Sequence, residues 1–200
     1  MRWDDLFDDL EGQLEHELSA EEVDLRAEEE RLRLGRLALR DRIIAIRGWE
    51  PKHSPWSIRL RLTSGRHIDV RPDTVGRDWF SADLLGDGVT RAQCIVPLAA
   101  ISGILLTRSQ VAQSLAGPDR EQPERGLSAR LTLGFVLRDL CRRRASVDLD
   151  LLDETVAGTI DRVGRDHLDL AVHEPGSARR ESAVSQYRLV PFAQLSLVRV

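Results

Sequence analysis

The sequence has few of the residues on which several classes of protein depend. Of its 29 basic residues only Lys52 is a lysine, and such heavy use of arginine is typical of GC-rich coding. The two cysteines, Cys94 and Cys141, are too far apart for a Cys-x-x-Cys metal site and too few for a disulfide framework, which indicates a reducing setting. No apolar run approaches the roughly 18 residues of a membrane span, and the acidic first residues lack the layout of a signal peptide. We therefore expect a cytoplasmic protein without a membrane partner.

Motifs for catalysis and for cofactor binding are missing as well. The sequence contains no Gly-x-Ser-x-Gly, no Walker loop and no Gly-x-Gly-x-x-Gly. Its 5 histidines show no His-x-x-x-His spacing of the kind that zinc proteins place on a helix. We expect a protein that is not an enzyme and that holds no metal or cofactor. No residue argues for a small-ligand regulatory module.

Charge is distributed unevenly along the chain. Residues 1–30 hold 13 acidic residues against Arg2 and Arg26, whereas residues 31–200 carry a net positive charge. The acidic arm is either a solvated helix face or a surface that folds over a basic region and competes with nucleic acid for it. The overall pI of about 5.8 and the aromatic content of 4% are both low for a nucleic-acid-binding protein.

The first 47 residues have the pattern of an acidic amphipathic helical segment. Apolar residues recur at the spacing of one helix face, and from Leu25 to Ile46 they recur every seven positions. A single helix over residues 20–46 is expected, on the order of 40 Å long at 1.5 Å per residue. So long a helix pairs with another helix, in this chain or in a partner, or packs only its second half within the chain. The predicted partner-binding face consists of Trp3, Leu6, Phe7, Leu10, Leu14, Leu25 and Leu32.

An internal repeat is the most informative feature. Residues 74–80 (Thr-Val-Gly-Arg-Asp-Trp-Phe) match residues 162–168 (Arg-Val-Gly-Arg-Asp-His-Leu) at an offset of 88 positions. Residues 95–102 match residues 189–196 at an offset of 94, so the second copy has six extra residues, in the loop 173–186. Two matched blocks in the same order indicate a duplication.

Each copy has the pattern of five short strands joined by tight turns. Apolar and polar residues alternate with the period of two that half-buried strands show, which favours a small, strongly bent barrel. The segments with this pattern are residues 57–63, 67–70, 79–84, 93–96 and 101–105 in the first copy and 147–151, 155–160, 167–172, 187–190 and 195–200 in the second.

The repeat and the segments around it predict an α+β protein. Between the copies lies a polar stretch rich in proline and glycine, followed by a helix from Ser128 to Arg144. The candidate core contacts of that helix are Leu131, Phe135, Leu137 and Leu140. The expected domains are an acidic helical segment at residues 1–47, a first small barrel at 48–116, a linker at 117–127, and a helix with a second small barrel at 128–200.

This order of elements resembles the Sm-like and SH3-like small barrels. There an opening helix leads to a strand, a glycine turn, a strand, a Gly-x-Asp turn, a further strand, and a last short strand after a tight turn. The Gly-x-Asp turns of this chain are Gly76 to Asp78 and Gly164 to Asp166. We interpret these four residues as structural, with the short aspartate side chains capping their turns.

The resemblance does not extend to the RNA-reading residues of that family. RNA-binding Sm proteins carry an asparagine where this chain has Ser81 and Asp169, and a late Arg-Gly turn that this chain lacks. The resemblance therefore implies the fold without the base-reading pocket.

Over nearly its full length the chain is similar to a set of uncharacterised actinobacterial proteins, some labelled Fis-type regulators. The similarity rests on the opening Trp-x-x-Leu-Phe-x-Asp-Leu-Glu, on Arg-Leu-x-Leu-x-Asp-Arg at residues 36–42, and on Asp-Arg-Val-Gly-Arg-Asp at residues 161–166. The sequence shows no helix-turn-helix that would carry a regulator function of the Fis type.

Arginine clusters are the remaining candidate for a binding surface. Three lie at the end of the middle helix and three lie in or after the loop that only the second copy has. Arginine binds phosphate without needing a base pocket. The candidate phosphate-binding residues are Arg142, Arg143, Arg144, Arg179, Arg180 and Arg188.

These patterns predict a non-enzymatic cytoplasmic adaptor or regulatory protein. Tandem Sm-like barrels would form its platform, and the acidic helix would bind a protein partner or a second copy, in RNA or transcription machinery. The alternative is weak, sequence-independent binding of RNA or DNA, with the acidic helix as an autoinhibitor.

Overall fold

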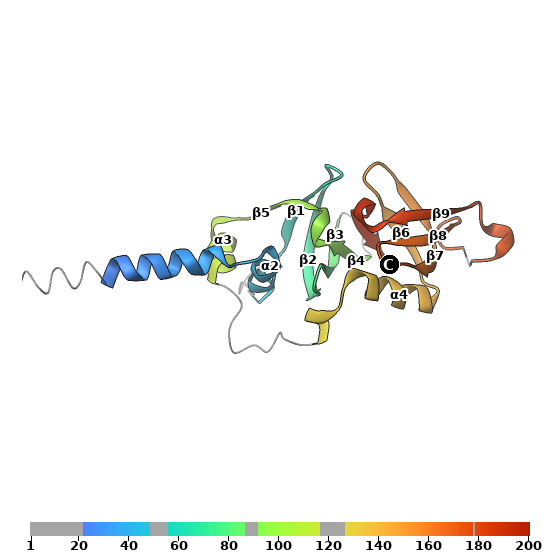
Figure 1. Ribbon diagram of the computed structural model, residues 1–200. Coiled ribbons are helices and arrows are strands. Elements are labelled where there is room, and N and C mark those ends of the chain that lie inside the picture. The colour runs from blue at the N-terminus through green and yellow to red at the C-terminus, as the bar shows by residue number, and fades with distance from the viewer. Residues whose placement is uncertain (1–21, 49–55, 87–91, 117–126, 178) are drawn as a thin grey trace, which may run out of the picture. The chain divides into compact units, whose positions relative to one another are not determined.

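The computed structural model describes residues 22–48, 56–86, 92–116, 127–177 and 179–200, and it is an α+β protein (Figure 1). The helices after residue 38 are α2 (Leu39–Arg47), α3 (Arg108–Ala116) and α4 (Leu133–Arg143). The strands of the first half are β1 (Ile58–Leu62), β2 (His67–Val75), β3 (Trp79–Leu85), β4 (Ala92–Pro97) and β5 (Ile101–Leu105). Those of the second half are β6 (Ser146–Asp150), β7 (Thr155–Val163), β8 (His167–Val172), β9 (Gln186–Pro191) and β10 (Leu197–Arg199).

The expected single helix over residues 20–46 is wrong. Residues 22–35 are helical, residues 36–38 are not, and α2 begins at Leu39. Gly35 stands at the end of the first helix, where the low helix propensity of glycine favours a stop. The described residues up to Ala38 belong to one unit, and Leu39–Val200 forms another. The seven-residue recurrence therefore runs across two helices, and α2 belongs to the unit that contains the sheet.

Ten strands form one antiparallel sheet in the order β5-β1-β2-β3-β4-β10-β6-β7-β8-β9. Each half repeats the same order, with the last strand beside the first and the others following in sequence. The halves join where β4 pairs with β10, with Ile95 opposite Val198 and Cys94 opposite Arg199. Because β4 pairs with the other half and not with β5, the sheet is not closed, and β5 and β9 are its end strands.

The pairing registers of the two halves are equivalent at the offsets seen in the sequence. Val75 pairs with Phe80, and 88 positions later Val163 pairs with Leu168. The first residues of β3 and β8 likewise pair with the prolines that end β4 and β9. The ten segments expected to be strands are all strands in the structure.

Each half also packs a helix against its second strand, α2 against β2 and α4 against β7. The two helices are held to equivalent turns by an arginine. Arg40 Nε donates to the carbonyl oxygen of Gly76 at 2.7 Å, and Arg138 Nη2 donates to that of Gly164 at 3.3 Å. A helix therefore accompanies the first set of strands as well as the second.

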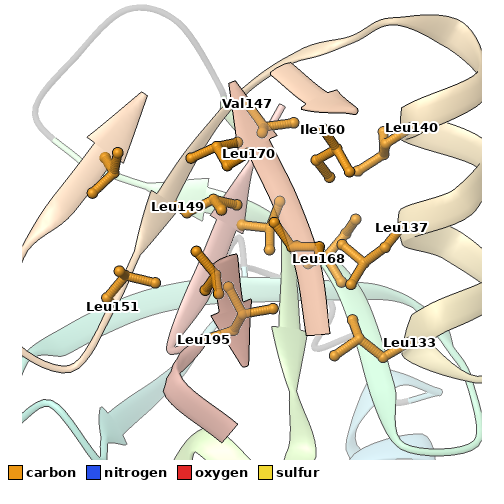
Figure 2. Packing of buried hydrophobic residues seen from close by; sticks show 14 of the residues in the cluster. Leu133, Leu137, Leu140, Val147, Leu149, Leu151, Ile160, Leu168, Leu170 and Leu195 are labelled. Atoms are coloured by element: carbon orange, nitrogen blue, oxygen red, sulfur yellow. The ribbon is translucent and has the colours of Figure 1, made fainter. Parts of the chain in front are cut away.

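The core beneath the second half is built on one face of α4. Leu133, Leu137 and Leu140 are buried and point from α4 toward the strands (Figure 2). Phe135 is 51% exposed, so the expectation that it contacts the core is wrong. It lies off the stripe that the spacing of the three leucines defines.

The two halves share their cores. The core under the second half includes Trp79 and Ile95, which belong to strands of the first half. The core under the first half includes Leu197 from β10. Each half thus contributes apolar side chains to the core of the other. Separating the halves would cost free energy, because each would expose apolar surface that the other now covers.

Helix α3 was not expected from the sequence. Its buried residues are the polar Gln110 and Ser114, so the sequence shows no apolar stripe from which this helix could be predicted. The Gln110 amide donates to the carbonyl oxygen of Ser57 at 2.8 Å, and Arg42 Nη2 donates to Ser114 Oγ at 2.8 Å. Thr107 and Gln110 form a Thr-x-x-Gln capping box, with reciprocal bonds of 3.3 and 2.9 Å, which was the available sequence signal.

Candidate functional site

The arginines at the end of α4 are held by carboxylates of the same chain. Arg142 Nη2 lies 2.7 Å from Asp139 Oδ1, and Arg143 Nε lies 2.7 Å from Asp139 Oδ2. The hydrogen bond from Arg142 holds the pKa of Asp139 below its usual range. Arg144 ends the helix in the left-handed conformation, at φ 53°, and reaches Asp161 at 3.0 Å.

A bidentate pair joins Asp161 on β7 to Arg179 in the connection between β8 and β9. Arg179 Nε donates to Asp161 Oδ1 and Nη2 donates to Oδ2, both at 2.7 Å. The Asp161 side chain is 15% exposed. The hydrogen bond from Arg179 lowers the pKa of Asp161, and the charge of Arg144 adds to the effect. A bidentate pair of this kind is among the stronger polar contacts in proteins.

Of the two remaining candidate arginines one is paired and one is not. Arg188 on β9 bonds Glu154 at 2.5 Å, and this hydrogen bond lowers the pKa of the glutamate. Arg180 is exposed and forms no ion pair with any residue that the structure describes. Five of the six candidate phosphate-binding arginines thus have a carboxylate partner already. A phosphate group would have to displace those partners.

A recess lies beside these pairs on the second half, and we call it the second recess. It has a volume of about 540 Å³ and is formed by β7, β8 and β9 together with Arg179 and Glu181 of the connecting segment. The Tyr187 hydroxyl donates to Glu181 at 2.9 Å, a bond that raises the pKa of the tyrosine. Leu189 also lines the recess. It is 64% exposed, because β9 is an end strand of the sheet and no strand lies beyond it.

A smaller recess of about 330 Å³ lies at the corresponding place on the first half, and we call it the first recess. Its polar lining consists of Arg71, Asp73, Ser81, Asp83 and Gln93, from β2, β3 and β4. Sequence reasoning did not find either recess, although the offset of 88 positions between the two copies aligns Asp73 with Asp161. That alignment, together with the arginine in the extra loop, was the available signal.

The predicted turn residues do occupy equivalent turns, but the aspartate side chains act differently from expectation. The turns are closed by backbone bonds, from Gly76 N–H to the Trp79 carbonyl at 2.8 Å and likewise in the second half at 2.9 Å. Asp78 Oδ1 accepts a hydrogen bond from the N–H of Leu133 at 2.7 Å, so it caps α4 and not its own turn. Asp166 instead bonds the ring of the adjacent His167, at 2.8 Å, and this bond lowers the pKa of Asp166.

A buried carboxylate that the sequence analysis missed lies where the halves meet. Asp150 at the end of β6 is 1% exposed. Arg66 from the β1–β2 turn and Arg199 on β10 each donate to it at 2.6 Å, and Thr155 Oγ1 donates at 2.7 Å. These contacts satisfy the charge that burial would otherwise penalise. They also connect a turn of the first half to strands of the second.

The predicted partner-binding helix face lies only partly within the described residues. Trp3, Leu6, Phe7, Leu10 and Leu14 fall outside them. Leu25 is 61% and Leu32 is 53% exposed, and both lie on the same face of the helix at residues 22–35.

The cysteines have the environment of inert thiols. Cys94 is buried, and burial raises the pKa of its thiol to about 12. The Cys141 thiol donates to the carbonyl oxygen of Asp161 at 3.3 Å. Within the described part of the chain, no three His, Cys, Asp or Glu side chains gather as metal ligands would. In that same part, the helices are all too short or too polar to span a bilayer.

Comparison with protein-family models, with curated proteins and with solved structures gives no match for this chain.

Proposed function

We propose that this chain is a non-enzymatic cytoplasmic adaptor or regulatory protein, whose acidic N-terminal helix binds a protein partner or a second copy. The observation that carries the proposal is the exposure of apolar side chains on the helix at residues 22–35. Leu25 and Leu32, which lie on the same face, are 61% and 53% exposed, and Val23 and Leu34 on the opposite face are 59% and 36% exposed. An amphipathic helix with an unburied apolar face gains free energy by docking that face on another helix or in a groove.

In this proposal the sheet supplies a rigid platform. Three kinds of contact between the halves support this. Arg66 of the first half bonds the buried Asp150 of the second, Asp78 caps α4, and each hydrophobic core includes side chains from the other half. A platform of this kind holds bound partners at a defined distance from one another, which is the property an adaptor needs.

We assign the two halves to Sm/SH3-like small folds, related by duplication. The support is the shared strand order, the equivalent registers, the helix packed on the second strand, and the glycine turn closed by the same backbone bond in each half. An actinobacterial origin and a partner in RNA or transcription machinery remain part of the proposal.

The ion pairs argue against the alternative, in which arginines bind RNA or DNA and the acidic helix inhibits them. Asp139, Asp161 and Glu154 already hold five of the six candidate arginines, so a phosphate would break existing hydrogen bonds to bind there.

Site-specific photo-crosslinking in cells tests the adaptor proposal. A photoreactive amino acid at Leu25 of the full chain is expected to capture a defined protein, or a second copy of the chain, identified by its crosslinked peptide. Leu32→Lys places a charge on the same helix face and should abolish the crosslink. Ala27→Lys places the same charge on the opposite, exposed face and should leave the crosslink intact.

Two results would overturn the proposal. One is a crosslink that survives Leu32→Lys. The other is the absence of any crosslink together with a monomeric mass in sedimentation at micromolar concentrations.

A further inference from the structure

The two recesses occupy the same position on the two halves. Asp73 and Asp161 correspond at the offset of 88, as do Ser81 and Asp169, and Gln93 corresponds to Tyr187 at the offset of 94. The strand registers confirm the correspondence, because Ser81 is paired with Ile95 as Asp169 is with Leu189.

In the second recess an arginine of the chain itself binds the shared aspartate. Both oxygens of Asp161 accept from the Arg179 guanidinium at 2.7 Å. Arg179 comes from the β8–β9 connection, which carries the six residues that the first half lacks. That connection is anchored by the bond from Tyr187 to Glu181 and by the buried ring of His173, which bonds Thr159 Oγ1 at 2.8 Å. The second recess therefore shows which ligand chemistry this position accepts.

In the first recess no described arginine bonds the Asp73 carboxylate, although Arg47 Nη1 donates to the backbone carbonyl oxygen of Asp73 at 2.8 Å. Among the described residues, the Asp73 carboxylate accepts hydrogen bonds only from hydroxyl groups, from Thr74 at 3.1 Å and from Ser81 at 3.5 Å. This carboxylate forms no ion pair with a described residue, and Asp73 is exposed. Asp83 adds a second carboxylate to this recess, at the position where the second half has Ala171.

We propose that the first recess is a docking site for an arginine side chain from an extended segment of a partner protein. Asp73 would hold the guanidinium as Asp161 holds Arg179, with Ser81 and Asp83 beside it. A carboxylate matches the two-pronged face of a guanidinium, and a lysine ammonium offers no such match. Two carboxylates against the single Arg71 also make this recess unfavourable for a phosphate group. The site belongs to the unit formed by Leu39–Val200, and the proposal does not depend on the adaptor proposal.

A peptide taken from this chain can be used as the probe for the first recess. A blocked synthetic peptide with the sequence of residues 176–183, Gly-Ser-Ala-Arg-Arg-Glu-Ser-Ala, contains the arginine that binds in the second recess. Titrated into the full ¹⁵N-labelled chain, it is expected to shift the backbone amide signals of β2, β3 and β4 around Asp73, with one site per chain. The same peptide with both arginines replaced by lysine should bind roughly tenfold more weakly.

Matched variants identify the residue that binds. Asp73→Asn should abolish the shifts. Asp69→Asn removes the same charge from the same strand, outside the recess, and should leave them unchanged. Arg179→Ala removes the bidentate partner of Asp161 and leaves the single bond from Arg144 at 3.0 Å, so a second set of shifts should appear on β7, β8 and β9 and the stoichiometry should rise from one site to two.

Three results would overturn the proposal. They are an absence of shifts at millimolar peptide, shifts that survive Asp73→Asn, and shifts that appear only after Arg91→Ala. The last would mean that the chain fills the first recess with its own arginine from the β3–β4 connection, whose residues 87–91 lie outside the described part.

Discussion

Asp78 and Leu133 are 55 positions apart, and the side chain of the first caps the helix that begins at the second. Asp78 Oδ1 accepts the Leu133 N–H at 2.7 Å. Thr132, at the N-cap position of α4, makes no side-chain cap bond. Just before α4, the Leu131 carbonyl accepts bonds from Arg77 N–H at 2.9 Å and Trp79 Nε1 at 3.0 Å. A turn of the first half thus fixes the start of the helix that covers the second half.

Removing this cap should destabilise the whole sheet unit. We expect Asp78→Ala to lower the free energy of unfolding by about 1 kcal/mol, the usual cost of losing a helix N-cap. The measurement is urea unfolding followed by circular dichroism. Asp166→Ala is the matched control, because the Asp166 side chain is 84% exposed and bonds only its neighbour His167. That control should leave the free energy of unfolding essentially unchanged. Equal effects of the two substitutions would contradict the capping role.

The equivalent glycines Gly76 and Gly164 should respond unequally to alanine. A Cβ at Gly76 would lie 2.2 Å from Nε1 of Trp79, which is buried and hydrogen-bonded to Leu131. A Cβ at Gly164 would meet the ring of His167 at 2.5 Å, but that ring is part-exposed and able to move. We expect Gly76→Ala to cost about 2 kcal/mol or more and Gly164→Ala less than about 1 kcal/mol. Thermal unfolding of both variants would show the difference, and equal losses would contradict it.

The Asp161–Arg179 pair should make stability depend on pH in acid. The hydrogen bond from Arg179 lowers the pKa of Asp161 in the folded state, so the folded protein binds the proton less tightly than the unfolded chain. The stabilisation is complete above the ordinary aspartate pKa of about 3.9 and is lost as the pH falls through the lower, folded value. The difference in unfolding free energy between wild type and Asp161→Asn should therefore be constant near pH 7 and shrink below about pH 4.

The same titration in a second background provides the control. In Arg179→Ala the carboxylate loses its main partner, so the pH dependence of the Asp161→Asn effect should diminish. A pH dependence that is unchanged by Arg179→Ala would show that another group is responsible.

Local patterns sufficed for the strands, the repeat and α4. Alternation with a period of two and glycine turns depend on a few neighbouring residues, so all ten strands were predictable to within a few positions. The break at residues 36–38 was missed because a lone Gly35 within an otherwise helical pattern is a weak signal. Phe135 was misplaced because an apolar residue on a helix does not by itself say which face the sheet will cover.

The arginines illustrate why the candidate site was less predictable than the fold. Arg179 and Asp161 are close only because β8 returns beside β7 and its connection to β9 folds back toward the strand, which no local pattern reports. Sequence reasoning therefore treated Arg179 as free to bind phosphate, whereas the structure gives it a bidentate carboxylate partner.

By itself the sequence determined the α+β class, the ten strands, and the order in which two similar halves follow each other. The periodicity of apolar residues and the residue preferences of turns are local properties, so they can be recognised in short stretches of consecutive residues. Only the tertiary structure decided that the halves share one open sheet through β4 and β10 and exchange core residues. It also decided that Asp150 is buried between two arginines and that one of two equivalent recesses holds its own arginine. These outcomes depend on which surfaces meet after folding, and burial and pairing are fixed only at that stage.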